Sequence, residues 1–396
     1  MDFELPDSAL AVREGVAAVA AKYDHAYWSR CEEEHRFPQE VYDDLAAGGW
    51  LGLAVPEEYG GGGQGMLELA VANETLCASG GTAGTFFYVT TPGFGSMTVT
   101  RHGTAEQKQR ILPGLATGEL QFCLALTEPD AGSNAIEITT SARRDGDEFV
   151  IKGQKIWISN VENADWMVAV TRTIPAAGTR NRGLPRTAGF TLFLIDVKEA
   201  LAAGTLSYQP IPKMGSNILC SSQVFFDDVR VPAANVIGEV DRGFGVLWDV
   251  LNPERILAAA GGIGAAQAAL DVAVGYACER EVFGRPIGAN QAIQFPLAQL
   301  KAKTELGRLM TYKAAWLFDN DRPCGNEANI AKLTGAQVGW EAANQAFQTL
   351  GGMAYSKEYP VERMFRDARI AKNIPVAEEL VLAHIGTSML GLPKSY

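Results

Sequence analysis

Two clusters of small hydrogen-bonding side chains and turn residues surround one tryptophan in the first half of the chain. They are the segments Leu126-Thr-Glu-Pro-Asp-Ala-Gly-Ser-Asn134 and Gly153-Gln-Lys-Ile-Trp-Ile-Ser-Asn160. The hydroxyl of Thr127 or Ser133, together with backbone N–H groups of the turn between them, can bind carbonyls and ring nitrogens of a ligand. Trp157 offers a flat apolar wall beside them. The pattern therefore predicts a cradle for a flat ring with polar edges.

Both motifs resemble, almost residue for residue, those of the acyl-CoA dehydrogenase family. The resemblance implies that the first motif holds the pyrimidine edge of a flavin, and that Trp157 and Ser159 pack and hydrogen-bond near the flavin N5. The expected cofactor is FAD. The cofactor-binding residues implied by this part of the chain are Leu124, Leu126, Thr127, Gly132, Ser133, Trp157, Ile158 and Ser159.

Two segments of the C-terminal half extend the resemblance. Arg280-Glu-Val-Phe-Gly-Arg-Pro-Ile-Gly-Ala-Asn-Gln291 is similar to the family segment whose Arg and Phe reach across a subunit boundary to the neighbour's FAD. Gln348-Thr-Leu-Gly-Gly352 is similar to the stretch that meets the dinucleotide, where glycines permit close approach. The implied FAD contacts here are Arg280, Phe283, Gln291, Gln348, Gly351, Gly352, Ala377 and Glu379. Such shared sites imply a homotetramer arranged as a dimer of dimers.

Chemistry on an acyl thioester requires a base. Removing the α-hydrogen as a proton, while the β-hydrogen leaves as hydride, needs a carboxylate in a dry pocket, where desolvation raises its pKa. Much of the family carries this Glu in a loop after a segment present here as Arg366-Asp-Ala-Arg-Ile370. Counting from Arg366 places Pro375 at that position. Proline cannot be the base, and it lacks the N–H that the family's loop gives to the thioester carbonyl.

A minority branch, which includes isovaleryl-CoA and long-chain acyl-CoA dehydrogenases, carries the Glu in the first turns of a helix. Leu251-Asn-Pro-Glu-Arg-Ile256 matches that position, so Glu254 is the expected base. Pro253 suits the first position of a helix and Asn252 suits an N-cap. The alternative role for Glu254 is to complement the helix dipole. Two further carboxylates remain alternatives for the base: Glu378 and Glu379. The expected substrate contacts are Ser133, Asn252, Arg255 and Val376.

The elements that must position these motifs begin with a helical region from Ser8 to about Leu115. Pro38 opens one of its helices, and Tyr59–Gly65 is a Gly-rich break. This break is interpreted as a flexible turn, because no Gly-Lys-Ser/Thr follows it as in a phosphate-binding loop. One face of the first helix is predicted to carry Val12, Val16, Val19 and Tyr23.

From about Gln121 to Val240 the pattern favours strands. Asp145-Gly146 separates two alternating stretches, which indicates a hairpin. The stretches that fit strands of a small barrel or sandwich are Ile138–Arg143, Glu148–Lys152, Phe190–Ile195 and Val224–Phe226. The basic stretch Ala176–Arg186 is interpreted as a solvated loop, with a contact to CoA phosphates as the alternative.

The helical period returns from Phe244 to the end. Ile256–Glu279 is crowded with Ala and Gly, which predicts a helix packed closely on several sides. A stripe interpreted as core comprises Leu306, Leu309, Met310, Trp316 and Leu317. The fold class is therefore α+β, with an N-terminal helical domain at 1–120, a β-barrel or sandwich domain at 121–240 and a C-terminal helical bundle at 241–396.

Composition excludes several classes of protein. The chain has 396 residues, 47% of them hydrophobic, which suffices for a large core. Its net charge of -12 disfavours nucleic acid or an anionic membrane as a partner. The start Met1–Asp7 lacks signal-peptide features, and no apolar run approaches the roughly 20 residues of a membrane span, so a cytoplasmic location is expected. Six scattered cysteines predict reduced thiols and no metal site.

The resemblance implies an oxidoreductase that acts on CH–CH groups in fatty acid or branched acyl metabolism. The substrate would be an acyl-CoA thioester, and an electron-transfer flavoprotein would accept the electrons. Two alternatives use the same fold: a flavin-dependent monooxygenase and a non-redox acyl-CoA enzyme. A binding homologue that has lost its chemistry would need a basic face for nucleic acid, which the charge balance disfavours.

Overall fold

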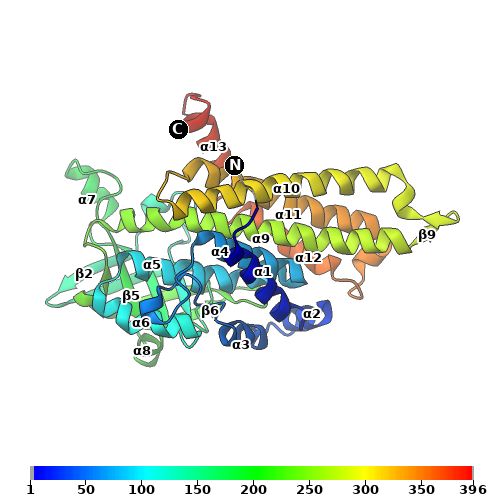
Figure 1. The fold of residues 1–396 in the computed structure, drawn as a ribbon. Coiled ribbons are helices and arrows are strands. Elements are labelled where there is room, and N and C mark those ends of the chain that lie inside the picture. Colours follow the sequence, from blue (N-terminus) through cyan, green and yellow to red (C-terminus); the bar gives the residue numbers. More distant parts are fainter. Residues whose placement is uncertain (1–3, 395–396) are drawn as a thin grey trace.

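The computed structural model describes residues 4–394, apart from the side chains of residues 83 and 84, and contains three regions in chain order (Figure 1). The first region is helical, as predicted. Its helices are α1 (Asp7–Ala20), α2 (His25–Glu33), α3 (Gln39–Ala47), α4 (Met66–Leu76), α5 (Ser96–His102) and α6 (Ala105–Thr117). The face of α1 that carries Val12, Val16 and Val19 is buried, whereas Tyr23 follows the end of the helix. The Gly-rich break lies in a turn before α4.

The second region is a mixed sheet of eight strands within the described chain. They are β1 (Phe122–Ala125), β2 (Ser141–Asp145), β3 (Glu148–Ser159), β4 (Trp166–Arg172), β5 (Phe190–Asp196), β6 (Leu206–Pro210), β7 (Ser221–Pro232) and β8 (Val236–Ile237). The order is β6-β7-β3-β2-β4-β5-β8, and β1 pairs in parallel with β4. The predicted hairpin is confirmed, because β2 and β3 are antiparallel across Gly146, whose φ is +65°.

The residues of β4 alternate between two hydrophobic cores. Trp166 and Val168 face a core shared with α6 and the start of the bundle, whereas Met167 and Ala169 face a core made by the strands themselves. One face of the sheet region thus packs in a core formed by its own strands, and the other face packs in a core shared with the helices.

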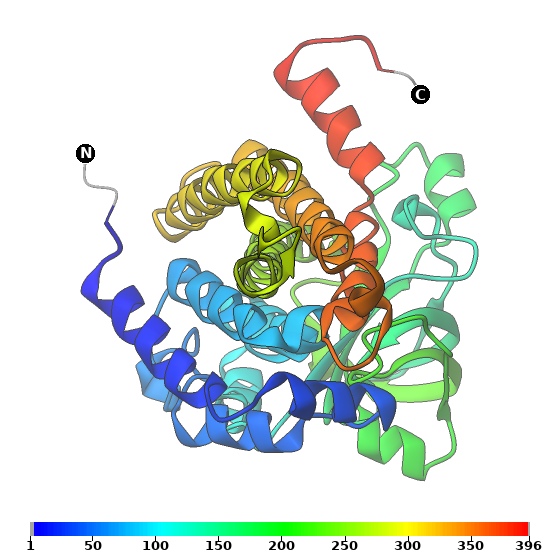
Figure 2. The ribbon, with the colours of Figure 1, turned by 90° about the vertical axis from the view of Figure 1, so that its right-hand side faces the viewer.

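The third region is a helical bundle. Its elements are α9 (Gly243–Glu279), α10 (Gln291–Asp319), α11 (Gly325–Leu350), α12 (Val361–Ala368) and α13 (Glu378–His384), with a two-stranded hairpin of β9 (Glu281–Val282) and β10 (Arg285–Pro286) between α9 and α10. Helix α9 lies in the middle of the bundle, surrounded by α4, α10 and α11 (Figure 2). An added Cβ at Gly262 would lie 2.4 Å from the Gly335 carbonyl oxygen, so glycine permits this close helix contact.

Helix α9 is also the one described helix that is long and apolar enough to cross a membrane, with a hydropathy of 1.5. However, 67% of that apolar window is buried inside the molecule. Its apolar character therefore matches its position in the centre of the bundle.

The start of α9 was predicted wrongly. The helix begins at Gly243, and Pro253 lies in its interior rather than at its first position. Three residues before the proline pack into the core shared with the sheet: Val246, Leu247 and Val250. The burial of these three side chains stabilises the helical turns that precede Pro253, although proline usually interrupts a helix. Because proline has no N–H, the carbonyl of Asp249, four residues earlier, lacks its usual helix donor.

The stripe on α10 is also wrong as a core assignment. Leu317 is buried, but Leu306, Leu309 and Trp316 are 67%, 52% and 47% exposed. Helical spacing identifies an apolar face correctly, yet it does not say what covers that face. In the single chain this face of α10 is exposed to solvent.

The basic stretch Ala176–Arg186 is not wholly a loop. Its first half forms the short helix α7 (Ala176–Asn181), because Pro175 precedes the first turn with a φ that is compatible with a helix start. Another short helix, α8 (Val197–Ala202), lies outside this stretch and follows β5. Arg180 and Arg186 reach the Glu137 carboxylate at 3.5 and 2.9 Å. These arginines are largely exposed, as the solvated interpretation predicts.

Candidate active site

A cavity of about 850 Å³ lies where the three regions meet. The sheet contributes Leu124, Leu126, Thr127, Trp157, Ile158 and Ser159 to its wall. The bundle contributes Leu251, Glu254, Leu257, Ala258, Gly261, Gly262, Ala265, Lys332, Ala336 and Gly339. The first region contributes Asn73, Cys77 and the segment from Thr82 to Phe94, and a C-terminal segment runs along the cavity from Arg366 to Pro375. Residues from the flavin motifs and the expected base thus share one cavity.

Trp157 stands out from β3 into this cavity. The pairing of β3 with β7 shifts register between Lys155 and Ile158, which marks an irregularity around the tryptophan. Trp157 has a φ of +63° and is 55% exposed. A positive φ is costly for a bulky residue and is found mainly where the surrounding structure enforces it at functional sites. The exposed indole is therefore a formed wall for a ligand.

A buried ion pair fixes the two flavin motifs to each other. Lys155 Nζ donates to Glu128 Oε1 and to the carbonyl of Leu126, both at 2.9 Å, and both charged side chains are buried. The Glu128 carboxylate also accepts hydrogen bonds from the backbone N–H groups of Thr139 at 2.6 Å and Thr140 at 2.8 Å. The sequence interpretation did not single out this pair, although both residues lie inside the motifs.

The protonation of this pair follows from its surroundings. Burial lowers the pKa of Lys155 to about 8, against the opposing effect of the Glu128 charge. Burial also raises the pKa of Glu128, but the Lys155 charge and the hydrogen bonds outweigh it, so this pKa lies below its ordinary value. Both groups are therefore charged at neutral pH.

The turn after Thr127 is closed by two hydrogen bonds between the backbones of Glu128 and Ala131, at 3.1 and 3.2 Å. Gly132 and Ser133 are exposed, and within residues 4–394 their N–H groups donate to no protein acceptor. Neither residue lines the cavity itself. The N–H groups of Gly132 and Ser133 could therefore donate to a ligand that extends from the cavity to this turn.

Glu254 lies on the face of α9 that borders the cavity. Leu251, Leu257 and Gly261 occupy the same face at helical spacing. In the described part of the chain the Glu254 carboxylate makes no hydrogen bond. Burial raises the pKa of Glu254 to about 7, although the neighbouring Arg255 charge lowers it. A carboxylate with this pKa is suited to accept a proton near neutral pH.

The alternative role for Glu254, interaction with the positive end of the helix dipole, is not supported. That effect is confined to the first turn, and Glu254 lies well inside a helix that begins at Gly243. Asn252 is likewise not an N-cap; its Oδ1 accepts from Arg255 Nη1 at 3.0 Å. Asn252 and Arg255 lie near Glu254 along α9 but do not line the cavity.

The C-terminal carboxylates are not placed as bases. Glu378 accepts from Gln337 Nε2 at 2.7 Å and pairs with Lys372 at 3.0 Å. Burial raises the pKa of Glu378, but these partners outweigh it and leave the pKa below its ordinary value. Glu379 is exposed, and neither carboxylate lines the cavity. Pro375 does line it, whereas Val376 does not.

The remaining expected FAD contacts do not line the cavity of their own chain. They are Arg280, Phe283, Gln291, Gln348, Gly351, Gly352, Ala377 and Glu379. Phe283, with an exposure of 101%, is at the tip of the β9–β10 hairpin, which projects from the end of the bundle away from the sheet (Figure 1). Their role in cofactor binding stays a prediction.

The segment Arg366–Ile370, selected from the sequence, ties the bundle to the rest of the molecule. The buried Asp367 carboxylate accepts from the Ser216 N–H at 2.7 Å and from Thr82 Oγ1 at 2.8 Å. Next to it, Arg366 Nη1 donates to Glu32 at 3.0 Å. Three regions therefore meet at one polar cluster on the cavity wall.

Sequence reasoning missed Lys332 on α11. Its side chain is 1% exposed and lines the cavity, and its Nζ has no hydrogen-bond partner in the described chain. A signal was present: Ala336 and Gly339 follow it at helical spacing, and small residues mark a closely packed face.

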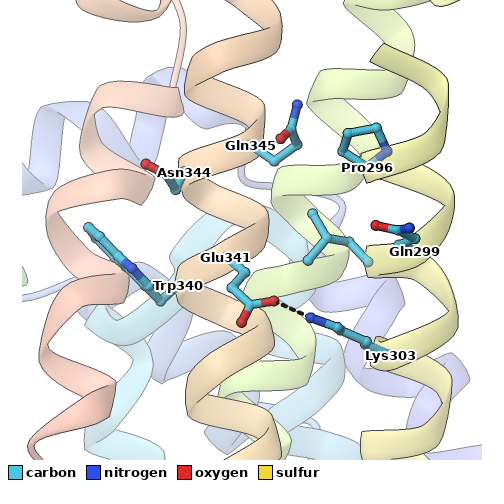
Figure 3. A pocket seen from close by; sticks show the side chains of 8 residues that line it. Pro296, Gln299, Lys303, Trp340, Glu341, Asn344 and Gln345 are labelled. Atoms are coloured by element: carbon cyan, nitrogen blue, oxygen red, sulfur yellow. Dashed lines mark hydrogen bonds and ion pairs between the residues drawn. The ribbon is translucent and has the colours of Figure 1, made fainter. Parts of the chain in front are cut away.

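A second, shallower hollow of about 250 Å³ lies between α10 and α11 (Figure 3). Lys303 and Glu341 form an ion pair of 2.8 Å across it. It contains none of the predicted site residues, so the central cavity is the candidate active site.

Comparisons with known proteins agree with the order of the three regions. Three family models match in order: the acyl-CoA dehydrogenase N-terminal domain at residues 6–119, the middle domain at 123–229 and the C-terminal domain at 241–389. The chain is 40% identical over 388 residues to acyl-CoA dehydrogenase FadE12 of Mycobacterium tuberculosis, covering 98% of this chain and 97% of the relative. It is 35% identical over 341 residues to the caffeyl-CoA reductase-Etf complex subunit CarC of Acetobacterium woodii, covering 86% of each.

Among solved structures, the glutaryl-coenzyme A dehydrogenase glutaryl-CoA complex matches with a TM-score of 0.93 at 30% identity, covering 100% of this chain and 98% of that one. The match spans all three regions that border the cavity. The chain therefore belongs to the acyl-CoA dehydrogenase family of oxidoreductases.

Proposed function

We propose that the protein is an FAD-dependent acyl-CoA dehydrogenase that introduces an α,β double bond into a CoA thioester, with Glu254 as the base. The main support for this proposal is the position of Glu254. Its carboxylate makes no hydrogen bond in the described chain, and it lines the same cavity as Trp157 and Thr127. Its pKa of about 7 suits proton abstraction at neutral pH.

The cavity fits a flavin. Trp157 offers an exposed ring face, and Thr127 and Ser159 bring hydroxyl groups to the same wall. The volume of about 850 Å³ is in the range of sites for cofactor-sized ligands. A bound flavin would supply the two-electron acceptor, taking the β-hydrogen as hydride. FAD is the proposed form, because the segments that end in Gln291 and Gly352 resemble those that meet its dinucleotide.

The residues of α9 would carry out the proton transfer. The Cα–H bond breaks and its proton passes to the Glu254 carboxylate, while the electron pair forms the Cα–Cβ double bond as the β-hydrogen leaves with its own pair. Leu251 and Leu257 flank the base with apolar side chains, which limits competing water. Ala258 and Gly261, small residues on the same face, leave room for an acyl chain.

The assembly and partner are proposed on related grounds. The exposed apolar face of α10, with Leu306, Leu309 and Trp316, suits burial against further copies of the chain in a homotetramer. The projecting hairpin would then bring Arg280 and Phe283 to a neighbour's FAD. An electron-transfer flavoprotein is the proposed electron acceptor, because the CarC relative is named as a subunit of an Etf complex.

The test is anaerobic reduction of the copurified flavin by a panel of acyl-CoA thioesters with straight, branched, aromatic and steroid side-chain acyl groups. At least one thioester should bleach the visible flavin absorbance. Bleaching by dithionite but by no thioester would contradict the proposal. A monooxygenase would release its reduced flavin on gel filtration, and a non-redox enzyme would convert the thioester while its flavin stayed oxidised.

A further inference from the structure

We propose that Lys332 donates a hydrogen bond to the thioester carbonyl oxygen of the bound acyl-CoA, where Pro375 leaves the C-terminal segment without an N–H. The inference rests on the proposed function, because it requires a thioester in the central cavity. It adds a catalytic contact from α11 to the base on α9.

Lys332 is a charged donor without an acceptor. Its side chain is 1% exposed, it borders the cavity, and Nζ has no hydrogen-bond partner within residues 4–394. An ammonium group carries three donors, and burying it unpaired is strongly unfavourable. A ligand oxygen in the cavity would remove this deficit, and a carbonyl oxygen accepts without adding a charge of its own.

The other cationic side chains on the described wall already donate to acceptors in the protein. Lys213 Nζ donates to the backbone carbonyls of Ser216 and Leu219 in its own loop. Arg366 and Arg369 are held by carboxylate and amide oxygens of their own segments. Lys332 is therefore the buried cationic donor on the described wall that is free for a ligand.

The helix packing places Lys332 and Glu254 on neighbouring turns of α11 and α9. An added Cβ at Gly335 would lie 2.6 Å from the carbonyl oxygen of Ala259, so α9 and α11 are in close contact there. Lys332 precedes Gly335 by one turn, and Glu254 precedes Ala259 by little more than one turn. Both side chains border the same cavity. The carbonyl oxygen and the α-hydrogen of a thioester are on adjacent carbons, so one ligand can meet both groups.

The chemistry requires such a donor. As Glu254 removes the α-proton, negative charge develops on the thioester oxygen, and a fixed donor at that oxygen stabilises the transition state more than the ground state. Pro375 lines the cavity but has no N–H to offer. A buried ammonium group is a stronger donor than the backbone amide that it would replace.

The charges around Lys332 keep it able to act at neutral pH. Burial lowers the pKa of Lys332 to about 8, Glu378 and Glu379 raise it, and Arg255 and Lys372 lower it. The group is therefore mainly protonated at pH 7 and mainly neutral above about pH 9.

The experiment measures the carbonyl group itself. A CoA thioester of the enoyl product, labelled with ¹³C at the carbonyl, is bound to the holoenzyme, and its C=O stretching frequency is read by difference infrared spectroscopy. The wild-type protein should shift this frequency downward relative to the free thioester. Lys332→Met should abolish most of the shift and lower kcat by about 10²-fold, the usual effect of removing one oxyanion donor. Lys332→Arg should keep part of the shift.

Lys303→Met is the matched control, because Lys303 pairs with Glu341 at 2.8 Å outside the central cavity and should leave the frequency and kcat unchanged. A Lys332→Met protein with the wild-type carbonyl shift and only a lower melting temperature would overturn the inference in favour of a structural role.

The wild-type protein provides a second test that does not depend on a variant. If Lys332 polarises the carbonyl, the downward shift should weaken between pH 8 and pH 10 as the ammonium loses its proton. A shift that stays constant over this range would also overturn the inference. Failure of every thioester to bleach the wild-type flavin would instead refute the proposed function, so the two failures are distinguishable.

Discussion

Replacing Glu254 by Gln should stabilise the folded protein at alkaline pH while it removes the base. Burial raises the pKa of Glu254 from 4.5 to about 7 because it disfavours the charged form. At about 1.4 kcal/mol for each pH unit, the ionised carboxylate costs the folded state about 3 kcal/mol. Below pH 4.5 the group is protonated in both states and costs nothing; the cost grows as the pH rises and is complete above about pH 7.

The measurement is the melting temperature of Glu254→Gln and wild-type protein at pH 4.5 and at pH 8. The two proteins should melt together at the lower pH, and the variant should melt about 3–4 °C higher at pH 8 for a chain of this length. An equal difference at both pH values would refute the argument, because a neutral packing effect of the substitution does not depend on the charge of Glu254.

The same variant tests the chemistry. Glu254→Gln should retain flavin but lose reduction by acyl-CoA by at least about 10²–10⁴-fold, the usual contribution of a general base. In the wild-type protein the reduction rate should rise with pH through about 7, as the carboxylate becomes ionised. Glu378→Gln and Glu379→Gln serve as matched controls and should be reduced at nearly the wild-type rate. Full reduction of Glu254→Gln would place the base elsewhere.

Three further changes test the site and the assembly. Lys155→Met or Glu128→Gln leaves one buried charge unpaired, so each should lower the free energy of unfolding by about 3–5 kcal/mol and weaken flavin retention, as urea titration and absorbance can measure. Leu309→Glu on the exposed face of α10 should shift the size-exclusion profile to smaller species with less bound flavin; an unchanged profile would show that this face is not an interface. Gly261→Val should reduce kcat/KM for long or branched thioesters more than for short ones, because the new side chain enters the cavity wall; a uniform loss would contradict this.

The fold and the part of the cavity wall formed by Thr127 and Trp157 could be predicted because they depend on local sequence pattern. The hairpin between β2 and β3 follows from Asp145-Gly146 between alternating stretches, and Thr127 and Trp157 lie in compact motifs. Glu254 lines the cavity, as its proposed role requires, although the start of its helix was predicted wrongly. Pro253 indicated a helix start, but burial of the preceding turns in the sheet core outweighed the cost of an interior proline.

Other features depend on contacts between distant elements or between chains, which cannot be inferred from the pattern of a single sequence. The periodicity of Leu306 and Leu309 is the same whether a helix faces its own core or another chain. Lys332 has the residue type of a surface position, and only the packing of α11 against α9 makes it buried. The pairing of Lys155 with Glu128 joins two motifs whose separation along the chain hides their contact.

Pro253 also determines how α9 can move. The turns before it are anchored in the core of the sheet, whereas those after it, including Ile256 and Leu257, are anchored in the core of the first helical region. At the junction the carbonyl of Asp249 has no helix partner, so bending there strains one backbone hydrogen bond fewer than elsewhere in the helix. Glu254 is the next residue after this pivot. A small rotation of the sheet region against the bundle would therefore move the carboxylate oxygen atoms of Glu254. The distance that this proposed base extends into the cavity thus depends on the angle of α9 at Pro253.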